Sequence, residues 1–262
     1  MKLVLGCMRR ADEDFGMINE GDKVVVGVSG GKDSLVLLYA LSLYRHFCKN
    51  SFDLEAVTLD LGIGKSDYSA IEALCEKINV KYTVRMTDIG DVIFNQRKET
   101  NPCALCAKMR RGSLTDFCRE VGANKLALGH HRDDAIETLA MSLLFEGRLH
   151  TFHPVTYLSK QQITQIRPMV YLPEKDIIHA CKKFELPVSK SPCPANGETK
   201  RTEMKNLLDD LCRRYPRARE YMLNALRNSD QYGLWDKPVD VASNPARLVP
   251  KKEKAAKETT DA

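Results

Sequence analysis

The chain has 262 residues, which allows one large domain or two small ones and is ample for a buried core. Hydrophobic residues make up 43% and charged residues 29%, as in water-soluble globular proteins. The longest mostly apolar run without a charge, Leu35–Tyr44, is far shorter than the roughly 18 residues that a membrane span needs. Because the N-terminus also lacks the apolar core of a signal peptide, we expect a cytoplasmic protein without a membrane segment.

Strand and helix patterns alternate along the chain. Runs of apolar and β-branched residues predict five strands, at Lys23–Ser29, Leu54–Asp60, Lys81–Met86, Lys125–Gly129 and Ile163–Arg167. Helical spacing of apolar residues, or a proline at the helix start, predicts the intervening helices, at Ser34–Phe47, Tyr68–Ile78, 104–121, Asp134–Leu144 and Glu174–Phe184. This alternation predicts an α/β fold, a doubly wound parallel sheet whose ligands lie at the carboxyl ends of its strands.

Composition divides the chain into four segments. Residues 1–20 are a lead-in, and the α/β domain spans 21–197. Residues 198–235 are basic and helical without strand signals, which predicts a short helical C-terminal extension. Residues 236–262 combine three prolines with a Lys-rich end and no helical stripe, which indicates a disordered tail.

Two basic segments stand out against a net charge of only +5. Residues 97–132 hold eight Lys or Arg against three Asp or Glu, and residues 199–219 hold seven against three. Such segments suggest a phosphate-rich partner such as a nucleic acid. Solvated helix faces would give the same pattern.

The sharpest local motif is SGGKDS at 29–34, where the first strand turns into a helix. Its glycines let backbone N–H groups approach an anion, and the helix N-terminus adds positive potential. Its lysine supplies a charge and its serines supply hydroxyls. The motif is neither a Walker A loop nor a GxGxxG fingerprint. The simpler alternative is a tight turn in which Asp33 or Ser34 caps the helix.

A second polar motif, GHHRDD at 129–134, follows the fourth strand. In a doubly wound sheet this loop borders the same crevice as the first one, so we expect the two to converge. The neighbouring carboxylates of Asp133 and Asp134 suit Mg²⁺, which prefers oxygen ligands. Alternatively, one of them caps the helix that follows.

Nine cysteines in a cytosolic chain are interpreted first as metal or redox groups rather than as disulfides. Cys103 and Cys106 form a CxxC motif at a helix start, where we expect lowered pKa values. The best third thiolate is Cys193, which lies between two prolines. Three thiolates suit a 4Fe–4S cluster with one open iron, while a redox dithiol and a three-ligand zinc site are the alternatives. Five other cysteines fall in helical stretches and suggest buried apolar side chains: Cys48, Cys75, Cys118, Cys181 and Cys212.

The SGGKDS motif resembles the PP-loop of the N-type ATP pyrophosphatases, which cleave ATP between the α and β phosphates and adenylate a substrate oxygen. The resemblance implies that pyrophosphate is held by Ser29, Gly30, Gly31, Lys32 and Ser34. It also implies that Asp33 organises Mg²⁺ or the reacting group. Asp60, at the end of the second strand, would lie near the adenosine, unless it is only a turn residue.

The order of motifs is similar to that of the tRNA 2-thiocytidine synthetase family over roughly residues 9–230: SGGKDS, CxxC with a basic helix, GHHRDD and a late single cysteine. This resemblance implies an ATP-dependent sulfurtransferase that adenylates the C2 oxygen of an anticodon-loop cytidine, at position 32, and replaces it with sulfur. It implies a 4Fe–4S cluster on Cys103, Cys106 and Cys193. The implied catalytic groups are Lys32, Asp33 and Asp133, and the implied further nucleotide contacts are Gly129, His130 and Asp134.

The same resemblance implies partners. Transfer RNA would bind the basic helix after the CxxC motif, through Lys108, Arg110 and Arg111, and the basic segment 199–219. A cysteine desulfurase or another donor would supply the sulfur, and a homodimer is a further expectation.

One departure keeps other activities open. Pro194, Ala195 and Asn196 follow Cys193 at the place where the family usually has a second cysteine, which favours the 2-thiouridine branch of the superfamily. That branch carries CxxC pairs near its N-terminus, where this chain has only Cys7. A PP-loop ligase of the tRNA lysidine synthetase type would not require the three cysteines. A non-catalytic iron–sulfur or zinc RNA-binding protein would not require SGGKDS.

Overall fold

The computed structural model describes residues 1–64, 66–97, 102–189, 193 and 200–228. Met1–Leu223 form one compact unit, and Asn224–Ala262 belong to a second. The predicted disordered tail at 236–262 lies outside the described residues. No helix in the described part of the chain is long and apolar enough to cross a membrane.

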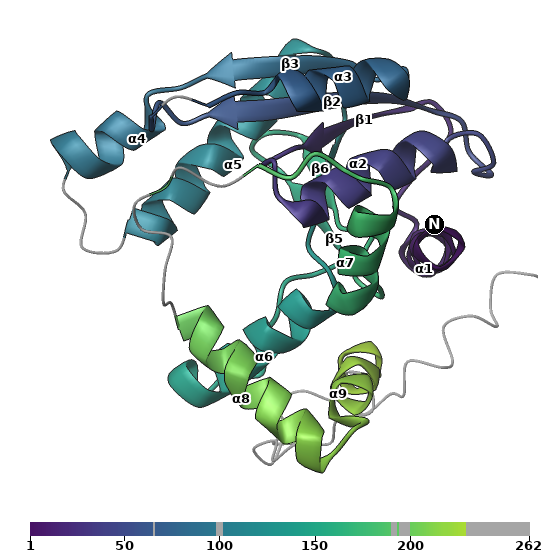
Figure 1. The fold of residues 1–262 in the computed structure, drawn as a ribbon, viewed down its shortest axis with the longest axis vertical. Coiled ribbons are helices and arrows are strands. Elements are labelled where there is room, and N and C mark those ends of the chain that lie inside the picture. The colour runs from purple at the N-terminus through teal and green to yellow at the C-terminus, as the bar shows by residue number, and fades with distance from the viewer. Residues whose placement is uncertain (65, 98–101, 190–192, 194–199, 229–262) are drawn as a thin grey trace, which may run out of the picture. The chain divides into compact units, whose positions relative to one another are not determined.

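Six strands form one sheet in the order β3-β2-β1-β4-β6-β5 (Figure 1). They are β1 (Asp22–Gly27), β2 (Phe52–Asp60), β3 (Lys81–Met86), β4 (Lys125–Ala127), β5 (Val155–Leu158) and β6 (Ile163–Ile166). All neighbours pair in parallel except β5 and β6, which are antiparallel. The predicted doubly wound parallel sheet is therefore confirmed. The sequence does not predict β5, a four-residue edge strand without a clear alternating pattern.

The helices connect and flank these strands. They are α1 (Lys2–Phe15), α2 (Lys32–Tyr44), α3 (Ser69–Lys77), α4 (Ile89–Asp91), α5 (Pro102–Glu120), α6 (Arg132–Glu146), α7 (Glu174–Lys183), α8 (Lys200–Arg214) and α9 (Ala218–Arg227), with a π-helical turn η1 at Val92–Gln96. The lead-in thus forms a helix, α1, that the sequence analysis does not predict. Its buried residues Val4, Met8 and Ala11 recur at helical spacing, so α1 packs one apolar stripe on the core.

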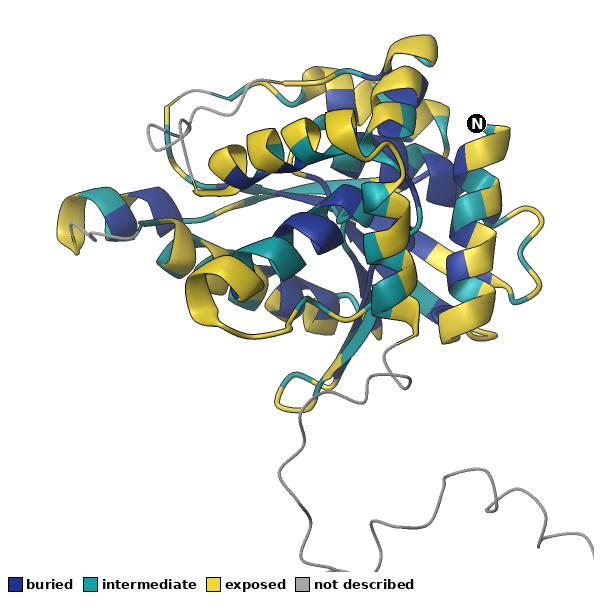
Figure 2. Ribbon diagram, turned by 90° about the horizontal axis from the view of Figure 1, so that it is seen from below, coloured by how far each residue is buried: buried dark blue, intermediate teal, exposed yellow. Residues whose placement is uncertain are grey.

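Both faces of the sheet are covered because successive side chains of a strand point to opposite sides. Val24 and Val26 pack in the core formed with α1, α2, α3 and α7. Val25, between them, packs in the core formed with α5. Figure 2 shows the corresponding pattern on the helices, whose buried faces turn inward and whose exposed faces turn outward. This arrangement leaves the carboxyl edge of the strands to the loops that carry the polar motifs.

Helix α8 packs away from the sheet, against α6. Met204 and Leu208 are buried together with Ile136 in a small apolar cluster. This contact joins the first basic helix of the extension to the helix that follows β4. It therefore determines which side chains of α8 face the carboxyl edge of the sheet.

Candidate active site

The SGGKDS turn connects β1 to α2 and is held by its own serines. Gly30 has a φ of 80°, in the left-handed region that favours glycine. Ser34 Oγ accepts the Ser29 N–H (3.1 Å) and donates to the Gly31 carbonyl (3.0 Å). The N-cap of α2 is Gly31, so neither Asp33 nor Ser34 caps this helix. The N–H groups at the start of α2 therefore remain available to an anion, and the capped-turn alternative is wrong.

The loop after β4 packs directly on the start of α2. A Cβ placed on Gly129 would lie 3.0 Å from the carbonyl carbon of Asp33 and from the nitrogen of Ser34. His131 Nε2 lies 3.6 Å from Asp33 Oδ1. The two polar motifs therefore converge at the carboxyl ends of β1 and β4, as the fold prediction requires.

His131 caps α6, so the alternative in which Asp133 or Asp134 is the cap is wrong. Its Nδ1 accepts the N–H of Asp134 (3.4 Å), and its own N–H donates to Asp134 Oδ2 (2.9 Å). Because Nδ1 accepts, the proton of a neutral ring lies on Nε2, which faces Asp33. Asp33 Oδ1 is buried and has no hydrogen-bond partner among the described residues. This oxygen is therefore suited to bind Mg²⁺.

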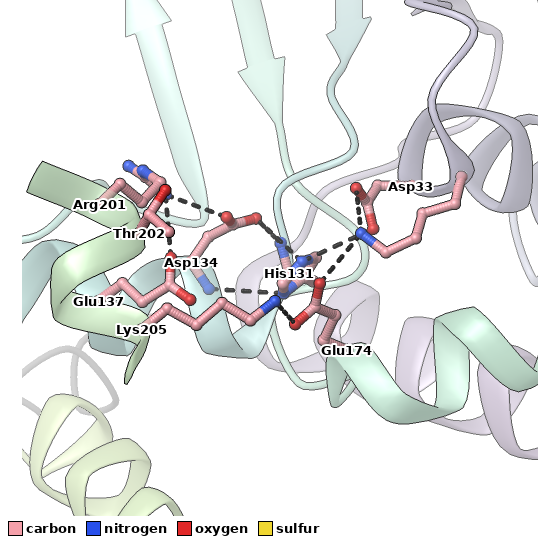
Figure 3. A pocket seen from close by; sticks show the side chains of 9 residues that line it. Asp33, His131, Asp134, Glu137, Glu174, Arg201, Thr202 and Lys205 are labelled. Atoms are coloured by element: carbon pink, nitrogen blue, oxygen red, sulfur yellow. Dashed lines mark hydrogen bonds and ion pairs between the residues drawn. The ribbon is translucent and has the colours of Figure 1, made fainter. Parts of the chain in front are cut away.

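A pocket of about 210 Å³ opens beside these loops (Figure 3). Its lining comes from α2, α6, α7, α8 and the loop before α6: Lys32, Asp33, His131, Asp134, Glu137, Glu174, Arg201, Thr202 and Lys205. Lys32 Nζ lies 3.0 Å from Asp33 Oδ2 and 3.1 Å from Glu174 Oε1. Burial alone would lower the pKa of Lys32, but these two carboxylates raise it overall. The lysine is therefore charged at neutral pH and suited to bind phosphate.

Acidic side chains of α6 and α7 face cations of α8 across the pocket. Lys205 Nζ lies 2.6 Å from Glu174 Oε2, and Arg201 Nη1 lies 3.0 Å from Asp134 Oδ1. Burial would raise the pKa of Glu174, but hydrogen bonds from Lys205 and Lys32 lower it to about 2. Burial, with Asp134 nearby, raises the pKa of Glu137 to about 7 despite Arg201. Glu174 is therefore firmly ionised, whereas Glu137 titrates near neutral pH.

Asp133 is not among the residues that line this pocket. Its Oδ2 accepts the N–H of Glu174 (2.8 Å), and its Oδ1 pairs with Arg219 Nε (2.9 Å). The buried carboxylate thereby connects α6 to the starts of α7 and α9. Its catalytic role remains a prediction.

His130 and Asp60 also lie outside the pocket lining. The His130 ring packs at a tilt against Phe152, with centroids 5.0 Å apart. Burial and the nearby Arg167 lower the pKa of His130 to about 4, so the imidazole is neutral at physiological pH. Asp60 Oδ1 accepts the N–H of Gly62 (2.8 Å), as a residue of a strand-end turn does. The predicted nucleotide contacts of His130 and Asp60 remain predictions.

The CxxC motif lies at the start of α5, with Cys103 exposed and Cys106 half-buried. Burial raises the pKa of Cys106, Arg110 opposes this rise, and the neighbouring thiols of Cys193 and Cys103 add to it. The lowered pKa expected from the helix N-terminus is therefore wrong for Cys106. This influence of Cys193 on Cys106 indicates that the two thiols are near each other.

The three thiols are the candidate ligands of a metal cluster. Within the described ranges, no three His, Cys, Asp or Glu side chains are arranged closely enough to hold a metal ion. The donor set nevertheless fits a cluster, since two sulfurs lie within one turn of a helix and a third approaches from a neighbouring segment. The buried Cys75, Cys118 and Cys181 agree with their prediction as apolar side chains, whereas Cys48 and Cys212 are only half-buried and Cys48 lies beyond the end of α2.

Four charged residues of the pocket were not among the predicted site residues: Glu137, Glu174, Arg201 and Lys205. Arg201 and Lys205 belong to the segment 199–219, which the family resemblance assigns to tRNA phosphates. Their spacing of four residues, which places both on one face of a helix, is the signal that the sequence contained. Their carboxylate partners on α6 and α7 are distant in sequence, so only the packing of α8 identifies them.

The parallel sheet and the phosphate-binding turn after its first strand define a PP-loop nucleotide-binding protein. Residues 8–208 match the PP-loop domain family. The chain is 37% identical over 231 residues to the tRNA-cytidine(32) 2-sulfurtransferase of Citrifermentans bemidjiense, covering 87% of this chain and 91% of that relative. It is 34% identical over 243 residues to the protein of the same name from Coxiella burnetii, covering 90% and 93%.

A solved structure agrees with these relatives. The U34-tRNA thiolase NcsA from Methanococcus maripaludis, solved with its 4Fe–4S cluster, matches with a TM-score of 0.71 and 25% sequence identity. The match covers 87% of this chain and 78% of that one. The chain therefore belongs to the tRNA 2-thiocytidine synthetase family of PP-loop proteins.

Proposed function

We propose that this protein is an ATP-dependent tRNA sulfurtransferase that replaces the C2 oxygen of cytidine 32 with sulfur. The observation that carries the proposal is the similarity to proteins named for this activity over more than nine-tenths of their length. The uncapped PP-loop turn and its charged lysine support the ATP-dependent part of the reaction.

The first step is adenylation. The C2 oxygen of the base attacks the α-phosphorus of ATP, the bond from that phosphorus to the bridging oxygen breaks, and pyrophosphate leaves. Lys32 and the free N–H groups of α2 stabilise the charge that develops on the departing pyrophosphate. Asp33, through its unpartnered oxygen, is the residue best suited to hold Mg²⁺.

The second step exchanges oxygen for sulfur. Sulfur at the oxidation level of sulfide attacks C2, the C2–O bond breaks, and AMP leaves with the oxygen, so the exchange needs no oxidant or reductant. Adenylation makes this possible because AMP is a far better leaving group than a carbonyl oxygen. Cys103, Cys106 and Cys193 would hold a 4Fe–4S cluster, which supplies an iron without a protein ligand as a site for the sulfur.

The partners follow from this activity. Substrate tRNA would contact Lys108 and Arg111, which are exposed, and the half-buried Arg110, all on α5 next to the CxxC motif. A cysteine desulfurase or another donor would deliver the sulfur. A cytoplasmic location and a homodimer belong to the same proposal.

Anaerobic assays with unmodified tRNA test the proposal directly. Protein reconstituted with iron and sulfide should form 2-thiocytidine at position 32 only when ATP is present, as measured by mass spectrometry of the nucleosides. Lys32→Ala should abolish thiolation and leave the iron content unchanged, because the lysine acts on phosphate and not on the cluster. Thiolation that does not depend on ATP, or an unaffected Lys32 variant, would contradict the proposal.

The cluster is tested through its third ligand. Cys193→Ala should lose most bound iron and all thiolation but retain ATP binding. Cys118→Ala is the matched control, because this thiol is buried within α5 and should keep both iron and activity. A full complement of iron in the Cys193 variant would show that the three-cysteine site is wrong.

A 2-thiouridine product is the second candidate. It is favoured by the similarity to a U34-tRNA thiolase and by Pro194, Ala195 and Asn196 after the third cysteine. The same nucleoside analysis decides between the two bases.

A further inference from the structure

A single carboxylate separates two lysines in the candidate nucleotide pocket. Glu174 Oε1 lies 3.1 Å from Lys32 Nζ, and Glu174 Oε2 lies 2.6 Å from Lys205 Nζ. Figure 3 shows Glu174 and Lys205 pointing toward each other from α7 and α8. Lys32 belongs to the PP-loop, whereas Lys205 belongs to a helix more than 170 residues later in the chain.

We propose that Lys205 is a second phosphate-binding lysine, and that Glu174 is a placeholder between the two lysines until the pyrophosphate moiety of ATP replaces it. This inference deepens the proposed function and rests on it. It concerns the phosphate subsite alone and makes no use of the cysteines.

The chemistry of the contact supports this assignment. A carboxylate with one oxygen on each ammonium group occupies the position that two oxygens of a phosphate chain would take. Pyrophosphate carries more negative charge and more acceptor oxygens than a carboxylate, so it competes effectively for the same two cations. Arg201 differs from Lys205 in its partners, because its guanidinium contacts two carboxylates, those of Asp134 (3.0 Å) and Glu137 (3.5 Å).

The backbones of both participants are held in place independently of their ion pair. Lys205 follows Met204, which is buried against α6, so the docking of α8 places the lysine at the pocket. Glu174 is the first residue of α7, and Asp133 accepts its backbone N–H (2.8 Å). The Glu174 side chain can therefore turn away from the lysines without displacing α7.

Calorimetric titration of the cluster-loaded, full-length protein with magnesium pyrophosphate, and separately with AMP, tests the role of Lys205. Lys205→Gln should weaken pyrophosphate binding about tenfold and change AMP binding less than about twofold. Lys200→Gln is the matched control on the same helix, because Lys200 pairs with Glu203 and does not line the pocket. Its affinities should remain within about twofold of wild type.

Glu174→Gln tests the placeholder, because glutamine keeps the shape of the side chain and removes its charge. It should bind pyrophosphate about three- to tenfold more tightly than wild type. The double variant Lys205→Gln/Glu174→Gln should bind pyrophosphate more weakly than Glu174→Gln alone. Because the double variant has no charged Glu174, this difference measures the contact between Lys205 and pyrophosphate and not the effect of a Glu174 that has lost its partner. Weaker binding by Glu174→Gln would overturn the placeholder.

The outcomes also separate this inference from the proposed function. Lys32→Ala should weaken pyrophosphate binding if the PP-loop holds phosphate. Loss of binding in Lys32→Ala with normal binding in Lys205→Gln would overturn the inference and leave the phosphate site standing. Normal binding in both variants would overturn the phosphate site and the inference together.

Discussion

Gly129 brings the backbone of the second polar motif close to that of the first. A Cβ there would lie 3.0 Å from backbone atoms of Asp33 and Ser34, which cannot move aside without shifting the start of α2. We expect Gly129→Ala to destabilise the protein by about 1–3 kcal/mol and to weaken ATP binding. Urea unfolding and ATP titration measure the two effects.

Gly112, in α5, supplies the control for this substitution. A Cβ at Gly112 has nothing within 4 Å, so alanine meets no obstacle. Since glycine is unfavourable inside a helix, Gly112→Ala should be neutral or stabilise by about 0.5–1 kcal/mol. Equal unfolding midpoints for the two variants would show that the contact at Gly129 is unimportant.

Glu137 should make stability depend on pH. Its pKa is about 7 in the folded protein against an ordinary value of 4.5. Between these values the folded state binds more protons than the unfolded state, so the free energy of unfolding falls as pH rises from about 4.5 to about 7. Glu137→Gln should remove this fall and gain stability relative to wild type above pH 7. Thermal unfolding from pH 4 to pH 8 tests this, and parallel curves for the two proteins would contradict it.

At the scale of elements, α8 lines the candidate nucleotide pocket as well as being a basic helix. Its docking depends on Met204 and Leu208, whereas Leu207 on the same helix is 50% exposed. Met204→Ala should destabilise the protein by about 2 kcal/mol or more and weaken ATP binding, because Lys205 loses its support. Leu207→Ala should leave both quantities near wild type. An unchanged ATP affinity in a destabilised Met204 variant would exclude α8 from the nucleotide site.

Local sequence patterns predict some elements of this fold and not others. Five of the six strands, including the edge strand β3, could be predicted because each contains a short local run of apolar and β-branched residues. Helix α1 and strand β5 could not, since α1 is a charged helix with a narrow apolar stripe and β5 is a short, partly exposed edge strand. The stability of both depends on tertiary packing more than on local preference.

At the scale of the whole molecule, charge should govern tRNA binding. Replacing Arg110 and Arg111 with alanine should weaken tRNA binding and lower the slope of log affinity against log salt by about 1.5–2, close to one per lost phosphate contact. Arg9→Ala/Arg10→Ala is the matched control, because it removes two exposed positive charges from α1. The same salt slope in both double variants would mean that Arg110 and Arg111 are an ordinary solvated face.

Sequence by itself determined the α/β sheet, the SGGKDS turn between its first strand and helix, the convergence of SGGKDS with GHHRDD, and the family. These features rest on local patterns and on the rule that the carboxyl ends of parallel strands share one edge. Only the tertiary structure decided that His131 caps α6, that Asp133 connects helix ends, and that Lys205 and Glu174 meet Lys32. The sequence alone does not distinguish a carboxylate that caps a helix from one that pairs with a cation or lines a pocket. Its role depends on contacts between segments far apart in the chain, and those contacts exist only once α7 and α8 have packed.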